Sequence, residues 1–123
     1  MEVVVAYVCP NPEAYVGKVV GTGQCVAFLQ KTTNVGHTSG WTPGERIKGA
    51  QYIAPGTAIA TFINGVYPNR SSGNHAAIYI SHDEHGIQVY DQWSGHAVSK
   101  RTIRYKAGDN DPSNDGDFYY VIE

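Results

Sequence analysis

The sequence predicts an α+β fold in which N-terminal helices pack on a central antiparallel β-sheet. Three observations support this class: helix signals fall before Pro55, alternating β-rich segments follow it, and polar turn signals separate those segments. The 123 residues suit one domain, so we expect residues 1–123 to form a single unit with one core. The sequence contains no repeat, linker or low-complexity segment.

Helix signals occur at three places before Pro55. Asn11 is a good helix cap, and Pro12 suits the first position of a helix. Thr22 can cap a helix that begins just after a glycine-containing stretch. Thr42 and Glu45 have the spacing of a capping box. The expected helical segments are Asn11–Val16, Cys25–Thr33 and a short turn through Arg46–Lys48.

β-Branched and alternating segments predict the strands. The expected strands are Val3–Val8 (equally well a packed extended segment), Gly56–Phe62, His75–Ile80, Ile87–Asp91, Val98–Tyr105 and Phe118–Ile122. The polar segment Ser81–Gly86 predicts a turn that joins two of these strands in a hairpin. In that hairpin His75 would lie close to Gln92, with Asp91 as its immediate neighbour.

Charge and hydropathy exclude two classes of partner. The formal net charge is -2, the pI is about 6.2, and no run of Lys or Arg exceeds two residues, so we expect neither a nucleic acid nor an anionic membrane as partner. Val3–Val8 is too short to span a bilayer, and Glu2 directly after Met1 is unlike a signal peptide. The protein is therefore expected to be made in the cytoplasm, and work outside it would require lysis or an injection machine.

Cys25 is the first candidate for chemistry. It would lie in the first turn of its helix, where free N–H groups and the helix dipole favour a thiolate. Phe28 and Leu29 follow at helical spacing, so Cys25 shares the inward face. Such a thiol is either a small buried hydrophobic group or a nucleophile. Cys9 is interpreted as structural, and a cytoplasmic origin argues against a disulfide.

A nucleophilic cysteine needs a base, and that base needs an orienting group. Of the five histidines, His75 alone opens an apolar strand directly after a polar loop. Asp91 ends the core-facing row of the next strand, where a carboxylate requires a partner such as an imidazolium. Gln92 is the alternative for the orienting role. A purely structural His75 and a solvated Asp91 are the corresponding non-catalytic interpretations.

Four segments in order resemble one family. They are Gly23–Val26, Pro55–Phe62, Gly73–Tyr79 and Val89–Trp93. Together they resemble the papain-like peptidoglycan hydrolases of the CHAP and NlpC type, over most of the chain from about residue 21 to residue 104. The resemblance implies a nucleophile at Cys25, a base at His75 and an orienting group at Asp91. Gln24 is a candidate donor to the oxyanion beside the Cys25 N–H, and Gln92 and Trp93 are the further residues expected to contact the oxyanion or the substrate.

The activity implied by the resemblance is hydrolysis of an amide bond in peptidoglycan peptide stems, through a thioester and without a cofactor. The small single-domain form is similar to amidase effectors that bacteria inject into rival cells, as in type VI secretion, and also to compact phage lysins. Either origin implies action in the periplasm or cell wall of a target cell. An injected toxin further implies a cognate immunity protein.

Three other functions are compatible with the same residues. The fold and thiol also suit an acyltransferase or a peptidase directed at proteins, and a binding module would use Cys25 only for packing. No metal is expected: Asp111–Asp117 begins like a calcium-binding loop, but Ile122 occupies the position of the acidic twelfth ligand. His82 and His85 lack a third ligand at zinc-site spacing.

Overall fold

The structure is a computed structural model, and it describes residues 6–68, 70–108 and 111–123. One α-helix, α1, spans Cys25–Thr32 within this part of the chain. The strands are β1 (Pro43–Arg46), β2 (Ala58–Thr61), β3 (Ala76–His82), β4 (Gly86–Trp93), β5 (His96–Arg104) and β6 (Tyr119–Ile122). Short 3₁₀ turns are found at Pro12–Tyr15, Thr38–Gly40, Pro112–Asn114 and Gly116–Phe118.

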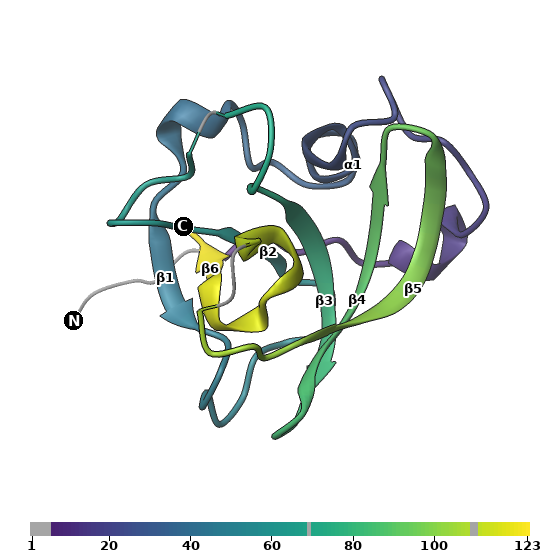
Figure 1. Cartoon of the computed structure of the whole chain (residues 1–123). Coiled ribbons are helices and arrows are strands. Elements are labelled where there is room, and N and C mark those ends of the chain that lie inside the picture. Colours follow the sequence, from purple (N-terminus) through teal and green to yellow (C-terminus); the bar gives the residue numbers. More distant parts are fainter. Residues whose placement is uncertain (1–5, 69, 109–110) are drawn as a thin grey trace.

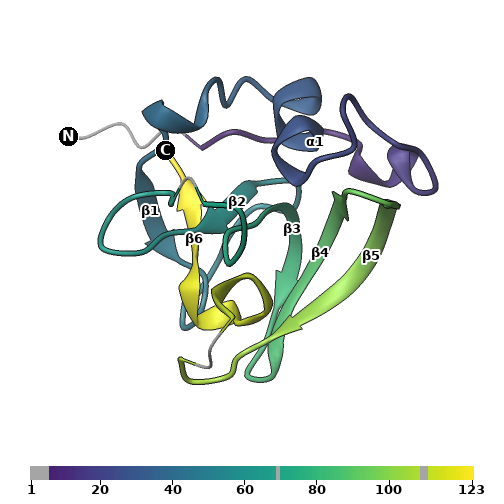
Figure 2. The ribbon, with the colours of Figure 1, turned by 45° about the horizontal axis from the view of Figure 1, so that its top comes forward.

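The six strands form one antiparallel sheet in the order β1-β6-β2-β3-β4-β5. Figure 1 shows a strongly curved sheet with α1 near one end of β3 and β4, both of which it contacts. Figure 2 shows the turn between β3 and β4 at the far end of these strands from α1. The α+β prediction is confirmed, but among the described residues a single α-helix replaces the expected set of helices. Pro12–Tyr15 forms only a 3₁₀ turn.

Both faces of the central strands are buried. All four residues of β2 are buried, and alternate residues belong to different hydrophobic clusters. Phe28 and Leu29 of α1 pack in one cluster, together with Ala58 and Ala60. Ile59 and its neighbours pack in the other, which Ile47 covers from the segment after β1. A curved sheet with two packed faces therefore supplies the core of this small chain.

Three alanines lie on the sheet face that α1 covers. Ala60 of β2 pairs with Ala76 of β3, and Ala58 lies two residues before Ala60 on the same face. Small side chains allow a helix to approach the sheet backbone closely. The N-terminus of α1 is consequently held against the start of β3. Cys25, the first residue of α1, therefore lies near His75, which directly precedes β3.

Two further local predictions before Pro55 are corrected by the structure. The expected helical turn after Thr42 is wrong, because Pro43–Arg46 forms β1 and the backbones of Thr42 and Glu123 exchange two hydrogen bonds of 2.8 Å. Pairing with the C-terminal strand satisfies these groups, so a capping box is not required. Thr22 does not cap α1 either: Gln24 occupies the cap position, and the Thr22 hydroxyl accepts only from the Gln24 N–H, at 3.4 Å.

The expected strand Val3–Val8 is described only in part, since residues 1–5 lie outside the described residues. Val8 forms an isolated antiparallel bridge with Thr57. The adjacent Cys9 N–H donates to the Gly56 carbonyl at 2.8 Å. This end of the described chain therefore lies beside the start of β2.

The register of the β3–β4 hairpin differs by one residue from the prediction. Ile78 pairs with Tyr90, and a bulge between Tyr79 and Ser81 shifts the register again toward the turn. The turn is tight because the Asp83 carboxylate accepts from the backbone N–H groups two and three residues later. Extending the Ile78 pairing toward the start of β3 places His75 on the same face as Asp91 rather than opposite Gln92.

Candidate active site

The start of α1 is held by a buried glutamine on β4. The Gln92 amide oxygen accepts from the Val20 N–H at 2.9 Å, and its nitrogen donates to the carbonyls of Val20 and Gln24, each at 2.8 Å. Gly23 completes this loop with a φ of 88°, a conformation that glycine adopts without strain. These contacts tie the residues before Cys25 to the strand that carries Asp91.

Cys25 is a free, half-buried thiol whose contacts favour its ionised form. The His75 side chain, the Ala76 backbone N–H and the Tyr67 hydroxyl are the groups that favour this form. Burial, the largest single influence, acts to raise the pKa of the Cys25 thiol. The hydrogen bond and positive charge of His75, followed by the Ala76 and Tyr67 contacts, outweigh it and lower the pKa. The first turn of a helix adds a favourable dipole.

His75 is fixed at both its backbone and its ring. The backbone N–H donates to the Thr61 hydroxyl at 3.0 Å, and the Thr61 N–H donates to the His75 carbonyl, also at 3.0 Å. The ring Nε2 lies 2.7 Å from Oδ2 of Asp91, so the thiol is left to interact with the other side of the imidazole. Burial acts to lower the pKa of His75, but Asp91 and Cys25 raise it to about 9.

Asp91 is completely buried and is shared by two cationic side chains. Its Oδ2 accepts from His75 and from Arg101 Nε, at 2.7 and 2.6 Å. Oδ1 has no hydrogen-bond partner among the described residues. A buried carboxylate needs compensating partners, and this double contact supplies them and fixes the plane of the imidazole.

The arrangement favours the pairing of a Cys25 thiolate with a His75 imidazolium. The lowered pKa of Cys25 and the raised pKa of His75 both favour that state. A thiolate can attack a carbonyl carbon, and an adjacent imidazolium can protonate the leaving group. Asp91 is the carboxylate that contacts His75, whereas Gln92, the sequence alternative, lies on the other face of β4 and contacts the α1 loop.

The remaining predicted contact residues occupy different environments. Gln24 is exposed, and neither its side chain nor the Cys25 N–H has a hydrogen-bond partner among the described residues. Gln92 is fully buried with its amide nitrogen used by two carbonyls, so its predicted contact with the oxyanion or substrate does not fit. Trp93 is 40% exposed, lies edge-on to His75 and stacks on His96 with ring centroids 4.0 Å apart.

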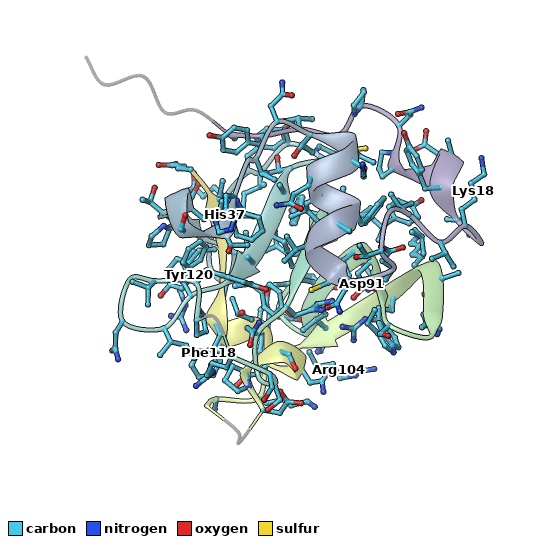
Figure 3. The ribbon with its side chains drawn as sticks, turned by 90° about the horizontal axis from the view of Figure 1, so that it is seen from above. Lys18, His37, Asp91, Arg104, Phe118 and Tyr120 are labelled. Atoms are coloured by element: carbon cyan, nitrogen blue, oxygen red, sulfur yellow. The ribbon has the colours of Figure 1, made fainter. Side chains whose placement is uncertain are left out.

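A polar cleft of about 660 Å³ opens beside His75. Its lining residues are Ser72, Gly73, Asn74, His75, Trp93, Arg101, Asp111, Ser113 and Asn114. Figure 3 shows Asp91 beside one end of α1, with Arg104 of the same sheet farther from the helix. A second cleft, of about 690 Å³, includes residues of the β3–β4 turn and none of the candidate catalytic residues. Of the three candidate catalytic residues His75 alone lines the first cleft, which therefore opens beside the candidate site.

Three residues of the site were not predicted from the sequence. Tyr67, from the loop after β2, contacts Cys25; burial and the nearby Cys25 charge raise the pKa of its hydroxyl. Thr61 holds the His75 backbone, and Arg101 contacts Asp91. Thr61 lies in a β-rich segment and Arg101 in a predicted strand, and neither position carries a local signal of function. Each of them acts only through a residue that is distant in sequence.

The described residues contain no group of three or more His, Cys, Asp or Glu side chains arranged to hold a metal ion. Asp111 instead accepts from the Ser113 N–H and from the Asn114 side chain, as expected for a polar turn. In the same part of the chain no helix is both long and apolar enough to cross a membrane.

Comparison with known proteins identifies close relatives. Residues 1–122 match the family described as Domesticated amidase effector 2. The chain is 39% identical to a type VI secretion amidase effector 2 protein of Salmonella typhi, over 95% of this chain and 98% of that protein. It is 38% identical to domesticated amidase effector 2 of Ixodes scapularis, over 94% and 83% of the two chains. A solved structure of type 6 secretion amidase effector 2 (Tae2) superposes with a TM-score of 0.86 at 40% identity, over 95% of this chain and 94% of that one.

Proposed function

This chain belongs to the Domesticated amidase effector 2 family, and on that premise we propose that it is a cysteine amidase that cleaves an amide bond in peptidoglycan peptide stems. The observation that carries the proposal is the contact of Cys25 with His75, whose ring is in turn held 2.7 Å from buried Asp91. The names of the relatives supply the reaction class, an amidase, and the geometry supplies a nucleophile, an acid–base group and an orienting group.

The proposed reaction proceeds in two halves. The Cys25 thiolate attacks the carbonyl carbon of the amide, and a C–S bond forms while the carbonyl oxygen becomes an oxyanion. His75 donates its proton to the amide nitrogen, the C–N bond breaks, and the amine leaves a thioester on Cys25. Neutral His75 then takes a proton from water as the water attacks the thioester. A C–O bond forms, the C–S bond breaks, and the carboxylic acid leaves and loses its proton to solvent, which restores the thiolate–imidazolium pair.

The oxyanion is proposed to bind at the N-terminus of α1. Among the described residues, the Cys25 N–H and the exposed Gln24 side chain are donors without partners at this position, and the helix dipole favours negative charge there. Trp93 forms a wall of the cleft and is proposed to contact the substrate. Gln92 acts as a positioning residue, because its hydrogen bonds hold the loop that precedes Cys25.

The biological setting follows from the relatives. One of them is described as a type VI secretion effector, so we propose that this protein is delivered into a target cell and acts on peptidoglycan in its periplasm. A toxin of this kind implies an immunity protein in the producing cell. The order of Cys25, His75 and Asp91 along the fold is also that of the wider CHAP and NlpC type of papain-like hydrolases, to which we assign the chain.

The test is digestion of purified sacculi, followed by mass spectrometry of the released fragments. Cys25→Ala and His75→Ala should each reduce release by at least about 10³-fold while the circular dichroism spectrum stays unchanged. Cys9→Ala and His85→Ala are the matched controls, since neither residue lies in the cleft, and both should retain activity. Full activity of Cys25→Ala would overturn the proposal, whereas fragments carrying a transferred acyl group would identify an acyltransferase.

A further inference from the structure

Arg101 lies between the buried carboxylate and the open cleft. Its Nε donates to Asp91 Oδ2 at 2.6 Å, and its side chain is 26% exposed. The guanidinium carbon lies 5.2 Å from the centroid of the Trp93 ring, which itself forms part of the cleft wall. Arg101 is thus held at its inner side by an ion pair and supported by an aromatic ring, and it reaches the space beside His75.

Most of the hydrogen-bonding capacity of Arg101 is unused within the protein. A guanidinium offers five N–H donors, of which the Asp91 contact uses the one on Nε. The two terminal nitrogens have no hydrogen-bond acceptor among the described residues. Asp91 Oδ1 is also without a partner there, so the ion pair is not bidentate. If Arg101 served only to neutralise Asp91, a two-bond pairing that used both oxygens would be the stronger arrangement.

The surroundings of these free donors favour an anionic ligand. Arg101 shares the cleft with His75, whose pKa Asp91 and Cys25 raise to about 9. The one carboxylate in the lining, Asp111, is already bound by donors from Ser113 and Asn114. A planar guanidinium recognises a carboxylate through two parallel hydrogen bonds, and partial burial strengthens that contact.

From this placement we infer that Arg101 binds a free carboxylate of the peptide stem while the scissile amide lies at Cys25. The inference rests on the proposed function, and it goes beyond it by naming the chemical group that selects the substrate. A stem whose carboxylate is converted to a carboxamide loses the charge-assisted hydrogen bonds. We expect kcat/KM to fall roughly 10- to 100-fold for such a stem, the range of a hydrogen bond to a charged group.

The experiment uses a set of stem peptides in which each free carboxyl group in turn is converted to a carboxamide. The wild-type protein should discriminate strongly against one member of the set. Arg101→Gln should reduce that discrimination to less than about threefold, even though its absolute rates also fall through Asp91. The loss of the Asp91 contact lowers the rates for all peptides alike, so it cancels in the ratio of kcat/KM between carboxylate and carboxamide peptides. A purely structural role of Arg101 would therefore leave this ratio unchanged in Arg101→Gln. Arg101→Lys keeps the charge beside Asp91 but not the planar fork, and should discriminate to an intermediate degree.

Arg104→Gln is the matched control, because Arg104 is an exposed arginine of β5 outside the cleft, and it should discriminate like the wild type. Thermal melting verifies that each variant is folded. Calorimetric binding of the same peptides to Cys25→Ala separates the role of Arg101 in substrate binding from the amidase activity. An Arg101-dependent preference for the carboxylate in binding, without cleavage by the wild type, would overturn the amidase function alone. No carboxylate preference in either assay would overturn the role of Arg101.

Discussion

Asp91 and Gln92 are neighbours in the chain whose side chains serve opposite faces of β4. Asp91 contacts the His75 ring, and Gln92 holds the backbone of Val20 and Gln24 just before α1. His75 and the residues before Cys25 are therefore both positioned from one strand. This arrangement fixes the distance between Cys25 and His75 through two short, buried connections rather than through the loops that separate them in sequence.

Cys25 should react with iodoacetamide at neutral pH at least about tenfold faster than Cys9. The thiolate is the reactive form, the pKa of Cys25 is lowered, and Cys9 is buried with 1% of its surface exposed. Mass spectrometry of proteolytic peptides after short exposure measures both rates. His75→Ala should slow the modification of Cys25 and leave that of Cys9 unchanged. Equal rates for the two thiols in the wild type would show that Cys25 is a packing residue.

The dependence of kcat/KM on pH should show an alkaline decline with an apparent pKa near 9. His75 carries the proton for the leaving amine, and its pKa is raised from 6.5 to about 9, so the imidazolium persists through neutral pH and is lost above about 9. Asp91→Asn removes an anion that raises this pKa, and should move the decline to lower pH. An unchanged profile in that variant would separate Asp91 from the ionisation of His75.

The same pKa shift makes a contribution to folding stability with a defined sign. A histidine whose pKa is higher in the folded state stabilises the fold fully below its unfolded pKa of 6.5, and the contribution is lost as the pH rises through about 9. Urea unfolding of wild type and His75→Gln between pH 6 and pH 10 measures this difference. The gap between the two proteins should narrow as the pH rises, and a gap that widens would contradict the assignment.

Gln24→Ala should reduce kcat roughly 10- to 100-fold without changing the melting temperature, because an exposed oxyanion donor acts only in the transition state. Steady-state kinetics on a soluble muropeptide provide the measurement. Gln51→Ala, an exposed glutamine that lines the other cleft, is the control and should retain full activity. Wild-type kcat in Gln24→Ala would remove Gln24 from the oxyanion site.

Gln92→Leu should destabilise the fold by about 3 kcal/mol, because it leaves one N–H and two carbonyls of the α1 loop without their buried partner. Activity should fall as well, since the loop before Cys25 loses its connection to β4. Urea unfolding gives the free energy. Gln88→Leu is the matched control on the same strand: its single side-chain bond to Thr102 is exposed, and its loss should change stability by less than about 0.5 kcal/mol.

Local sequence patterns determined the parts of this structure that depend on neighbours in the chain. Helical spacing after Cys25 predicts α1, and alternation predicts β2 to β6 closely. Cys25 at the helix start and His75 ahead of an apolar strand are visible for the same reason, because a helix terminus and a strand end are local features. The pattern at Thr42–Glu45 was misleading because a distant strand, β6, competed for the backbone groups that a helix would have used.

Only the tertiary structure decided which side chains meet. The register of β3 against β4 differs by one residue from the predicted register, and it places Asp91, not Gln92, on the face of His75. This register is accompanied by the Asp83 turn and by a bulge, neither of which leaves a periodic signal in the sequence. Arg101 joins the site through pairing of β4 with β5, and Tyr67 joins it through the fold of a loop. Register and loop placement are set by the sum of many long-range contacts. The sequence by itself determined which groups are available for chemistry, and the packed sheet determined how they are connected.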